Sequence, residues 1–591
     1  MMKTSKWENK KVIYSITLIS MLILTIIFLN SFYWPYEELS KRKMLVATIA
    51  VIFVAVIPVV VVKNIFLCEC ISRMIKNVEQ AIEWLKVNKK KVLLYGGVIL
   101  LGSVLAFTAT RFLSKYILHK VFNMHLFYTI IVFGVLGLIV KIMWKSIANH
   151  PEKLYVVIAL TVGIYAIAVT PARVGVSWDD EIHYARALEI SNFLNGIMYD
   201  ADEKNIADYA TNIYGRTGYD RYSDYEYRQI LEKSYDNKEW NAHEFNYYNV
   251  WSISYIPSAL GIILARGLGL SYAGVFNMGR FFNLLMYICL IYCAMKKAKY
   301  GKVLIAAIGL IPTMIFMATS YSYDPWVVGF TILGFSYYFS ELQEEGPIQT
   351  KNLLIIVGSI VLGCIPKAIY FPILFPLLFM PKRKFKNSKQ RALYYLFIVA
   401  GGLLLVASFL LPMLISGPGT GDVRGGSAVN STQQILFILK NPLAYLKILT
   451  EFELGYISIQ NVGGMVQKFA YVGDGYFGGT ICVILTALAC FDRGEQEKNH
   501  YIIRGASLFG NMVAIVLATT ALYISFTAVS SDTVAGMQGR YMLPTFYPAL
   551  YALGITGVKH KINKTLFVCV PMLMIVFTFI LNMFKLCVLY Y

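Results

Sequence analysis

The chain has 591 residues, of which 57% are hydrophobic and 15% are charged, whereas a soluble protein of this length would carry about a quarter charged residues. These proportions exclude a large soluble domain, and repeated apolar runs of about 20 residues predict an all-α polytopic membrane protein. The formal charge of +20 does not indicate a nucleic-acid partner, because the lysines and arginines gather in short stretches between apolar runs, as they do in cytoplasmic loops.

The first 150 residues are predicted to form an accessory module of transmembrane helices. The N-terminal apolar run has no small-residue cleavage site after it, so we interpret it as an uncleaved span. Basic stretches before the third and fifth spans predict that the N-terminus lies inside and that the fifth span ends on the outer face. Four spans of this module are predicted at about 12–30, 44–62, 92–112 and 121–141, and the fifth span of the chain follows at about 154–171.

A long polar interval follows the fifth span. Between Asp179 and Glu244 it has 15 acidic residues against 7 basic ones, in a chain whose net charge is positive. We expect residues 172–250 to form a small extracytoplasmic loop domain within a core that covers residues 151–345. If a helix starts near its beginning, Asp179, His183 and Arg186 lie on one face of that helix.

The next apolar segment determines the topology of the rest. Residues 252–268 are apolar but short and contain Pro257, so we interpret them as an interfacial segment. The turn at Asp324 then faces the same side as Asp179, and residues 346–591 form a C-terminal set of spans with an outer loop at 415–475. The remaining spans are predicted at about 275–295, 303–320, 326–341, 352–366, 369–380, 392–413, 477–491, 504–528, 541–557 and 565–588, which gives a bundle of about 13–15 helices.

Three acidic residues are expected at this outer face, namely Asp179, Asp180 and Asp324. A sugar hydroxyl is a poor nucleophile, and a carboxylate could take its proton as a general base. Asp180 and Asp324 could also hold a divalent cation, Mg²⁺ or Mn²⁺, against a phosphate leaving group. The alternative is helix capping, because residues 177–180 resemble a capping box and Asp324 precedes a proline at a helix start.

Basic residues embedded in or near the apolar spans are candidates for binding a phosphate. Ionisable groups in such places usually line a cavity or pair with another charge. Lys367 and Arg540 are both expected near the outer interface, and a guanidinium can bind phosphate through two N–H groups. For Arg540, snorkelling to lipid headgroups is the alternative. Arg186 could bind phosphate or pair with Asp179 or Asp180.

Several of these residues lie in motifs that resemble a family of bacterial polytopic membrane proteins, DUF2142. The family's approximate P-D-E-x-A-H-F-x-R-A motif resembles residues 178–187, with Asp180 in place of the usual Glu. Its Q-G-R-Y-F-L-P motif resembles residues 538–544, which include Gln538, Arg540 and Tyr541. A Ser-x-Asp turn at 322–324 and a Lys-x-x-Tyr element at 367–370 extend the resemblance to about residues 155–555.

The wider arrangement resembles the GT-C membrane glycosyltransferases. The resemblance implies a GT-C-like helical bundle in the bacterial cytoplasmic membrane, with a polyprenyl-phosphate-linked sugar as donor and a cell-surface glycan as acceptor. Because the charged groups converge on one membrane face, we expect catalysis by Asp179 or Asp180 as base, with Asp324 as helper or metal ligand. The residues expected to bind substrate are His183, Arg186, Lys367, Gln538, Arg540 and Tyr541. For His183, a role as base and a purely structural role stay open as alternatives. Two alternatives stay open. A polysaccharide transporter or flippase component predicts charges strung through the membrane midplane, and a glycan polymerase would rely more on outer-loop arginines.

Overall fold

The computed structural model describes residues 89–585 except 118–122, 195–199, 202–239, 242–249, 417–421, 471–476, 495, 556–557 and 559–560. The spans predicted at 12–30 and 44–62 and most of the outer loop domain therefore lie outside the described residues. Within them, the chain is almost entirely helical, and its two short strands, β1 (Asp200–Ala201) and β2 (Trp240–Asn241), pair antiparallel.

Seven helical stretches of the described part are long and apolar enough to cross a membrane, which confirms an all-α, multi-pass membrane protein. They are α6 (Met124–Met143), α7 (Pro151–Val169), α12 (Tyr272–Lys297), the stretch of α16 (Thr350–Cys364) and the 3₁₀ helix η2 (Ile365–Phe379), which is broken at Lys367, α17 (Ser388–Ser416), α22 (Tyr501–Ser525) and α24 (Lys564–Phe584). The remaining elements of the bundle are α5 (Lys89–Tyr116), α13 (Lys302–Gly309), α14 (Pro312–Ala318), α15 (Asp324–Gln343), α21 (Gly478–Phe491), η5 (Gly539–Thr545) and α23 (Phe546–Leu553).

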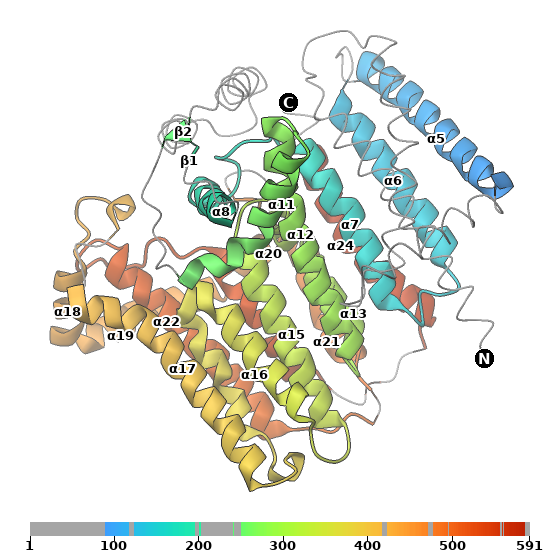
Figure 1. The fold of residues 1–591 in the computed structure, drawn as a ribbon. Coiled ribbons are helices and arrows are strands. Elements are labelled where there is room, and N and C mark those ends of the chain that lie inside the picture. Colours follow the sequence, from blue (N-terminus) through green and yellow to red (C-terminus); the bar gives the residue numbers. More distant parts are fainter. Residues whose placement is uncertain are drawn as a thin grey trace.

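The bundle is built as a row of helices that follows the sequence. Helices α5, α6, α7, α12, α15, α16 and α17 each pack on the next, so that the blue and cyan helices lie on one side of Figure 1 and the yellow ones on the other. The central helix α7 is buried along most of its length, because α6, α12 and α24 all pack against it. Helix α22 packs against η2.

Two predicted spans are interrupted and not continuous helices. The segment predicted at 303–320 consists of α13 and α14, because Pro312 has no N–H for the helical ladder and Ile311 before it has an extended backbone. The segment predicted at 541–557 begins with η5, which contains Pro544, and continues as α23. A proline restricts the residue before it, and this explains the break at Pro312.

Helix α16 and η2 form a hairpin, in agreement with the two spans predicted at 352–366 and 369–380. The chain reverses at Lys367, whose φ of −144° and ψ of 71° are not helical. The amide of Ile348 donates to the carbonyl of Lys384 at 2.8 Å, so the chain returns to the end at which α16 began. Lys367 is therefore at the turn, at the far end of the hairpin.

The segment predicted to be interfacial forms η1 (Val250–Tyr255) and α11 (Ile256–Gly267). A helix of 12 residues extends about 18 Å, less than the hydrocarbon core of a bilayer. Helix α11 packs on α12 and α8 (Asp180–Leu194), and its opposite face exposes Leu260, Leu264 and Leu268. The length excludes a full span, and the interfacial position of α11 stays a prediction.

The two ends of the bundle differ in charge. At one end, which we call the basic end, Lys384 donates to the carbonyl of Glu344 at 2.5 Å, Lys297 forms an ion pair with Glu341, and the amide of Lys498 donates to the Gln343 side chain at 2.7 Å. The other end, which we call the site end, contains the end of α7, the start of α15, the turn at Lys367 and η5. The same end also contains α18 (Ser431–Lys440), α19 (Pro442–Tyr456) and α20 (Ile459–Gln467).

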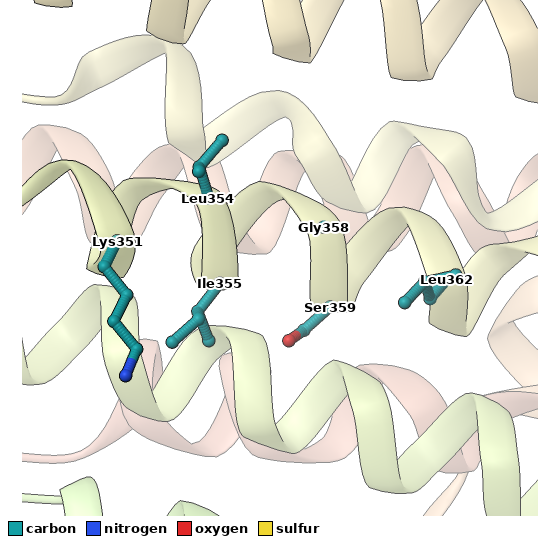
Figure 2. Close-up of a pocket in the computed structure, with 6 residues that line it drawn as sticks. All are labelled: Lys351, Leu354, Ile355, Gly358, Ser359 and Leu362. Carbon is teal, nitrogen blue, oxygen red and sulfur yellow. The ribbon is translucent and has the colours of Figure 1, made fainter.

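An open groove of about 510 Å³ follows α16 between the two ends. Figure 2 shows its lining residues along that single helix, from Lys351 to Leu362. Apart from Lys351 and Ser359 the lining is apolar or glycine, so no carboxylate or imidazole lines the groove.

Candidate functional site

The loop after α7 brings Asp179 to the site end. Asp179 has a φ of 52°, in the left-handed region that side chains other than glycine rarely adopt and that Asp tolerates better than most. Its carbonyl accepts the amide of His183 at 3.1 Å, which is the first hydrogen bond of helix α8. Asp179 is thus at the helix start, and its side chain is free to point away from α8 toward other elements.

Asp180, the next residue, is bound by its own loop. Its carboxylate accepts hydrogen bonds from the amides of Gly175 (2.8 Å), Val176 (3.2 Å) and Ser177 (2.9 Å). Burial raises the pKa of this carboxyl, and the three backbone bonds oppose that shift. Because α8 starts at Asp180 and its first hydrogen bond is to the Asp179 carbonyl, Ser177 is not the N-cap, and the bond from its amide is a loop contact and not the capping box expected from the sequence. The two adjacent acids therefore differ in position: Asp180 organises the loop and Asp179 faces the rest of the bundle.

Arg540 joins two carboxylates from distant segments. Its Nη1 donates to Asp324 Oδ2 at 3.0 Å and its Nη2 to Asp179 Oδ2 at 2.9 Å, across 361 positions of sequence in the second case. The guanidinium lies over the ring of Trp178, 5.0 Å from its centroid. Only 1% of the Arg540 side chain is exposed. An arginine this buried does not snorkel to lipid headgroups, so the ion-paired alternative is the one the fold adopts.

The start of α15 fixes the second carboxylate. Ser322 Oγ donates to Asp324 Oδ2 at 3.1 Å and accepts the Asp324 amide at 3.2 Å. The turn before it is held against α12, because the Asn283 side chain donates to the carbonyl of Ser320 at 2.9 Å. At Gly279 of α12 there is no room for a side chain, since a Cβ would lie 2.1 Å from the hydroxyl of Tyr321.

Lys367 approaches the same cluster from the turn of the α16–η2 hairpin. Its Nζ lies 2.9 Å from the ring centroid of Tyr541, the residue that follows Arg540 in the sequence. The hydroxyl of Tyr370 donates to the carbonyl of Tyr541 at 2.6 Å and ties η2 to η5. Lys367 Nζ is buried and has no hydrogen-bond partner among the described residues. An ammonium without a hydrogen-bond partner is costly to bury, so an anion beside Nζ would stabilise its charged form.

His183 lies one helical turn after Asp179 and is 5% exposed. Its Nδ1 is hydrogen-bonded to the hydroxyl of Tyr255 at 2.7 Å, and its ring meets that of Tyr323 edge-on with centroids 5.0 Å apart. Burial, and after it the nearby guanidinium of Arg540, lowers the pKa of His183 to about 4. The imidazole is therefore neutral at neutral pH.

Arg424 is a site residue that the sequence did not indicate. It lies in the loop after α17, and its Nη1 donates to Asp179 Oδ1 at 3.0 Å. Asp422 holds the same guanidinium from the other side, with an Nη2–Oδ2 distance of 2.7 Å, and thereby raises the pKa of Arg424. A single arginine in a glycine-rich stretch has no periodicity or spacing that could have revealed it. The only signal was its place in an outer loop.

The other predicted substrate-binding residues have different positions. Arg186 forms an ion pair with Glu189 at 2.7 Å and does not contact Asp179 or Asp180, because one helical turn brings Glu189 beside it. Gln538 accepts the Tyr456 hydroxyl on its backbone carbonyl at 2.8 Å, and its side-chain Oε1 is buried without a partner among the described residues.

The donor set does not fit a divalent metal. No group of three or more His, Cys, Asp or Glu side chains in the described ranges is arranged to hold one. Of the two acids predicted as ligands, Asp180 is bound by three backbone amides and Asp324 by Arg540 and Ser322. We therefore derive no step through a metal ion.

Together, these features define a multi-pass membrane protein with a buried, ion-paired site at one end of its helices. The family model described as "Predicted membrane protein (DUF2142)" matches residues 160–547, a range that includes every residue of the cluster. The chain belongs to this family. The description names no activity, and no curated protein and no solved structure matches the chain.

Proposed function

We propose that this protein is a glycosyltransferase of the bacterial cytoplasmic membrane that moves a sugar from a polyprenyl-phosphate carrier to a cell-surface glycan. The observation that carries the proposal is the buried Arg540, held by Asp179 and Asp324 beside the unpartnered ammonium of Lys367. The two carboxylates orient the guanidinium, and Lys367 Nζ, which lies over the Tyr541 ring, has no hydrogen-bond partner among the described groups. A phosphate between them would satisfy both cations.

The depth of the cluster supports a lipid-linked donor. The cluster lies at the ends of membrane spans, where the headgroup of a polyprenyl phosphate would sit. The basic end of the bundle is opposite, and lysines and arginines favour the cytoplasmic side. With that orientation the site faces outward, toward the glycan acceptor and the outer leaflet.

The proposed reaction breaks one bond and forms another at the anomeric carbon of the donor sugar. The acceptor hydroxyl oxygen attacks this carbon, and the bond to the phosphate oxygen breaks with its electron pair leaving on the polyprenyl phosphate. Arg540 and Lys367 stabilise the negative charge that grows on the phosphate. The hydroxyl proton must pass to a base, for which the sequence predicts Asp179 or Asp180.

A glycan polymerase is the second candidate, and Arg424 is the observation that favours it. An outer-loop arginine on Asp179 is the kind of group on which a polymerase would rely. Both functions use a lipid phosphate as leaving group, so they differ in the size of the transferred unit. Product length therefore distinguishes them: one added sugar supports the transferase, and a ladder of repeat units supports the polymerase.

A transfer assay tests the proposal. Purified protein in liposomes is given a panel of radiolabelled polyprenyl-phosphate sugars with cell-envelope glycan as acceptor. We expect one donor to be used, and we expect Arg540→Gln to abolish the transfer. Arg493→Gln is the matched control, because Arg493 is an equally buried arginine, 3% exposed, ion-paired with Glu497 at 2.8 Å near the basic end. Equal activity per folded protein in the two variants would contradict the proposal.

A further inference from the structure

We propose that His183 is the general base of the transfer and that Tyr255 is its positioning residue. The inference rests on the proposed glycosyl transfer and concerns the group that accepts the proton of the acceptor hydroxyl. It replaces the expectation, drawn from the sequence, that a carboxylate of the acidic pair does so.

The three carboxylates predicted to be catalytic, Asp179, Asp180 and Asp324, all accept hydrogen bonds from other groups. Oδ1 of Asp179 accepts a hydrogen bond from Arg424 and Oδ2 accepts one from Arg540, so both of its oxygens are ion-paired. Both oxygens of Asp180 accept backbone amides, and Asp324 Oδ2 is shared by Arg540 and Ser322. For Asp179 to act as base, one of its two ion pairs would first have to break.

His183 has a basic nitrogen that none of the described groups occupies. Its Nδ1 is bonded to Tyr255, whereas its Nε2 is buried and has no hydrogen-bond partner in the described part of the chain. The rings of Tyr255 and Tyr323 pack against the imidazole, with centroids 5.6 Å and 5.0 Å from its own, and restrict its rotation. A buried polar atom without a partner, in a ring whose orientation is fixed, is available to form a hydrogen bond with a ligand.

The hydroxyl of Tyr255 can accept a hydrogen bond from Nδ1–H of His183, and His183 acts as base in this tautomer. If Nδ1–H donates to the tyrosine oxygen, Nε2 has its lone pair free to accept a proton from a substrate hydroxyl. Burial raises the pKa of Tyr255, so the tyrosine stays neutral while it holds the ring. The hydrogen bond therefore positions the base without itself taking part in bond changes.

The charges around the ring favour its action once the donor is bound. Burial first, and then Arg540, lower the pKa of His183, while Asp179 and Asp324 raise it. A donor phosphate that pairs with the arginines cancels their effect and moves the imidazole pKa back toward neutrality. The titratable and charged groups that act on His183 or contact it are Asp179, Asp324, Arg424, Arg540, Tyr255 and Tyr323.

The acceptor hydroxyl gives its proton to Nε2 of His183, and its oxygen forms the new bond to the anomeric carbon. The bond from that carbon to the phosphate oxygen breaks, and its electron pair leaves with the polyprenyl phosphate. The imidazolium is then beside Asp179 and Asp324, whose negative charges stabilise it until the proton passes to the phosphate or to water.

The test compares His183→Asn and His183→Gln with wild-type protein in the liposome assay, together with donor binding to each. Asn keeps a polar atom near the position of Nδ1 and Gln near that of Nε2, but neither side chain is a base. We expect each variant to lose about 10²–10⁴-fold in the transfer rate, the contribution of a general base, while donor affinity changes less than about 3-fold. Tyr255→Phe should slow transfer less and move the acid limb of the pH–rate profile.

The outcomes separate this inference from the proposed function. If wild type transfers sugar and His183→Gln keeps its rate within about 3-fold, the base assignment is overturned and the glycosyl transfer stands. If wild type uses no donor of the panel, the proposed function fails and this inference fails with it. His183→Ala with added imidazole covers the case of poorly folded variants: rescue of transfer supports a missing base, and no rescue in folded protein opposes it.

Discussion

The replacement of Arg540 by glutamine is the sharpest test of the ion-paired site. The substitution removes both charged contacts and leaves Asp324, whose side chain is 5% exposed, as an unpaired buried carboxylate. The loss of Arg540 should cost less free energy at Asp179, because the Asp179 side chain is 24% exposed and keeps Arg424 as a partner. Breaking one side of a buried pair costs about 3–5 kcal/mol, and most of that cost here should come from Asp324.

The assay is a double-mutant cycle on purified protein in detergent, with the free energy of unfolding as readout. We expect Arg540→Gln to lower the stability by about 3–5 kcal/mol and the addition of Asp324→Asn to restore about 1–3 kcal/mol, because a neutral amide is less costly to bury alone. Adding Asp179→Asn instead should restore less. A double variant with Asp324→Asn that is no more stable than Arg540→Gln alone would refute the reasoning.

Three further predictions concern neighbouring residues. Asp180→Ala should lower the stability by about 2–4 kcal/mol, measured by thermal unfolding, because three backbone amides lose their acceptor; an unchanged midpoint would contradict its structural role. Arg424→Gln should weaken donor binding at nearly unchanged stability, whereas Lys447→Gln, at another exposed ion pair near the site end, should change neither. Because burial lowers the pKa of His183 from 6.5 to about 4, its contribution to stability is complete above pH 6.5 and is lost as the pH falls toward 4, by at most about 3 kcal/mol. His183→Gln should flatten this part of the stability–pH curve, and an identical curve would count against a buried neutral imidazole.

The sequence could predict which parts of the site come together, because membrane topology has few solutions. Each span reverses direction, so counting spans from a basic loop places Asp179, Asp324, Lys367 and Arg540 on one face. That prediction needs only hydropathy and charge, and the ion pairs between Arg540 and the two acids agree with it. The hairpin that turns at Lys367 was predicted in the same way.

The finer geometry of the site depends on backbone conformation and side-chain packing, which the spacing of residues in the sequence does not reveal. Asp179 and Asp180 take different roles because one has a left-handed backbone, a property that depends on the loop as a whole. Arg186 pairs with Glu189 and Arg424 reaches Asp179, and both contacts follow from side-chain directions in the folded chain. The break at Pro312 was readable in principle, since a proline inside an apolar run weakens a continuous helix.

The measurement that tests the account most directly is a cryo-electron-microscopy structure of the protein in a lipid nanodisc with a non-transferable polyprenyl-phosphate sugar analogue. The account predicts that the phosphate lies within hydrogen-bond distance of Lys367 Nζ and Arg540, with the sugar toward His183 Nε2. An analogue that binds elsewhere, for example along the groove of α16, or that leaves Lys367 without a partner would contradict it.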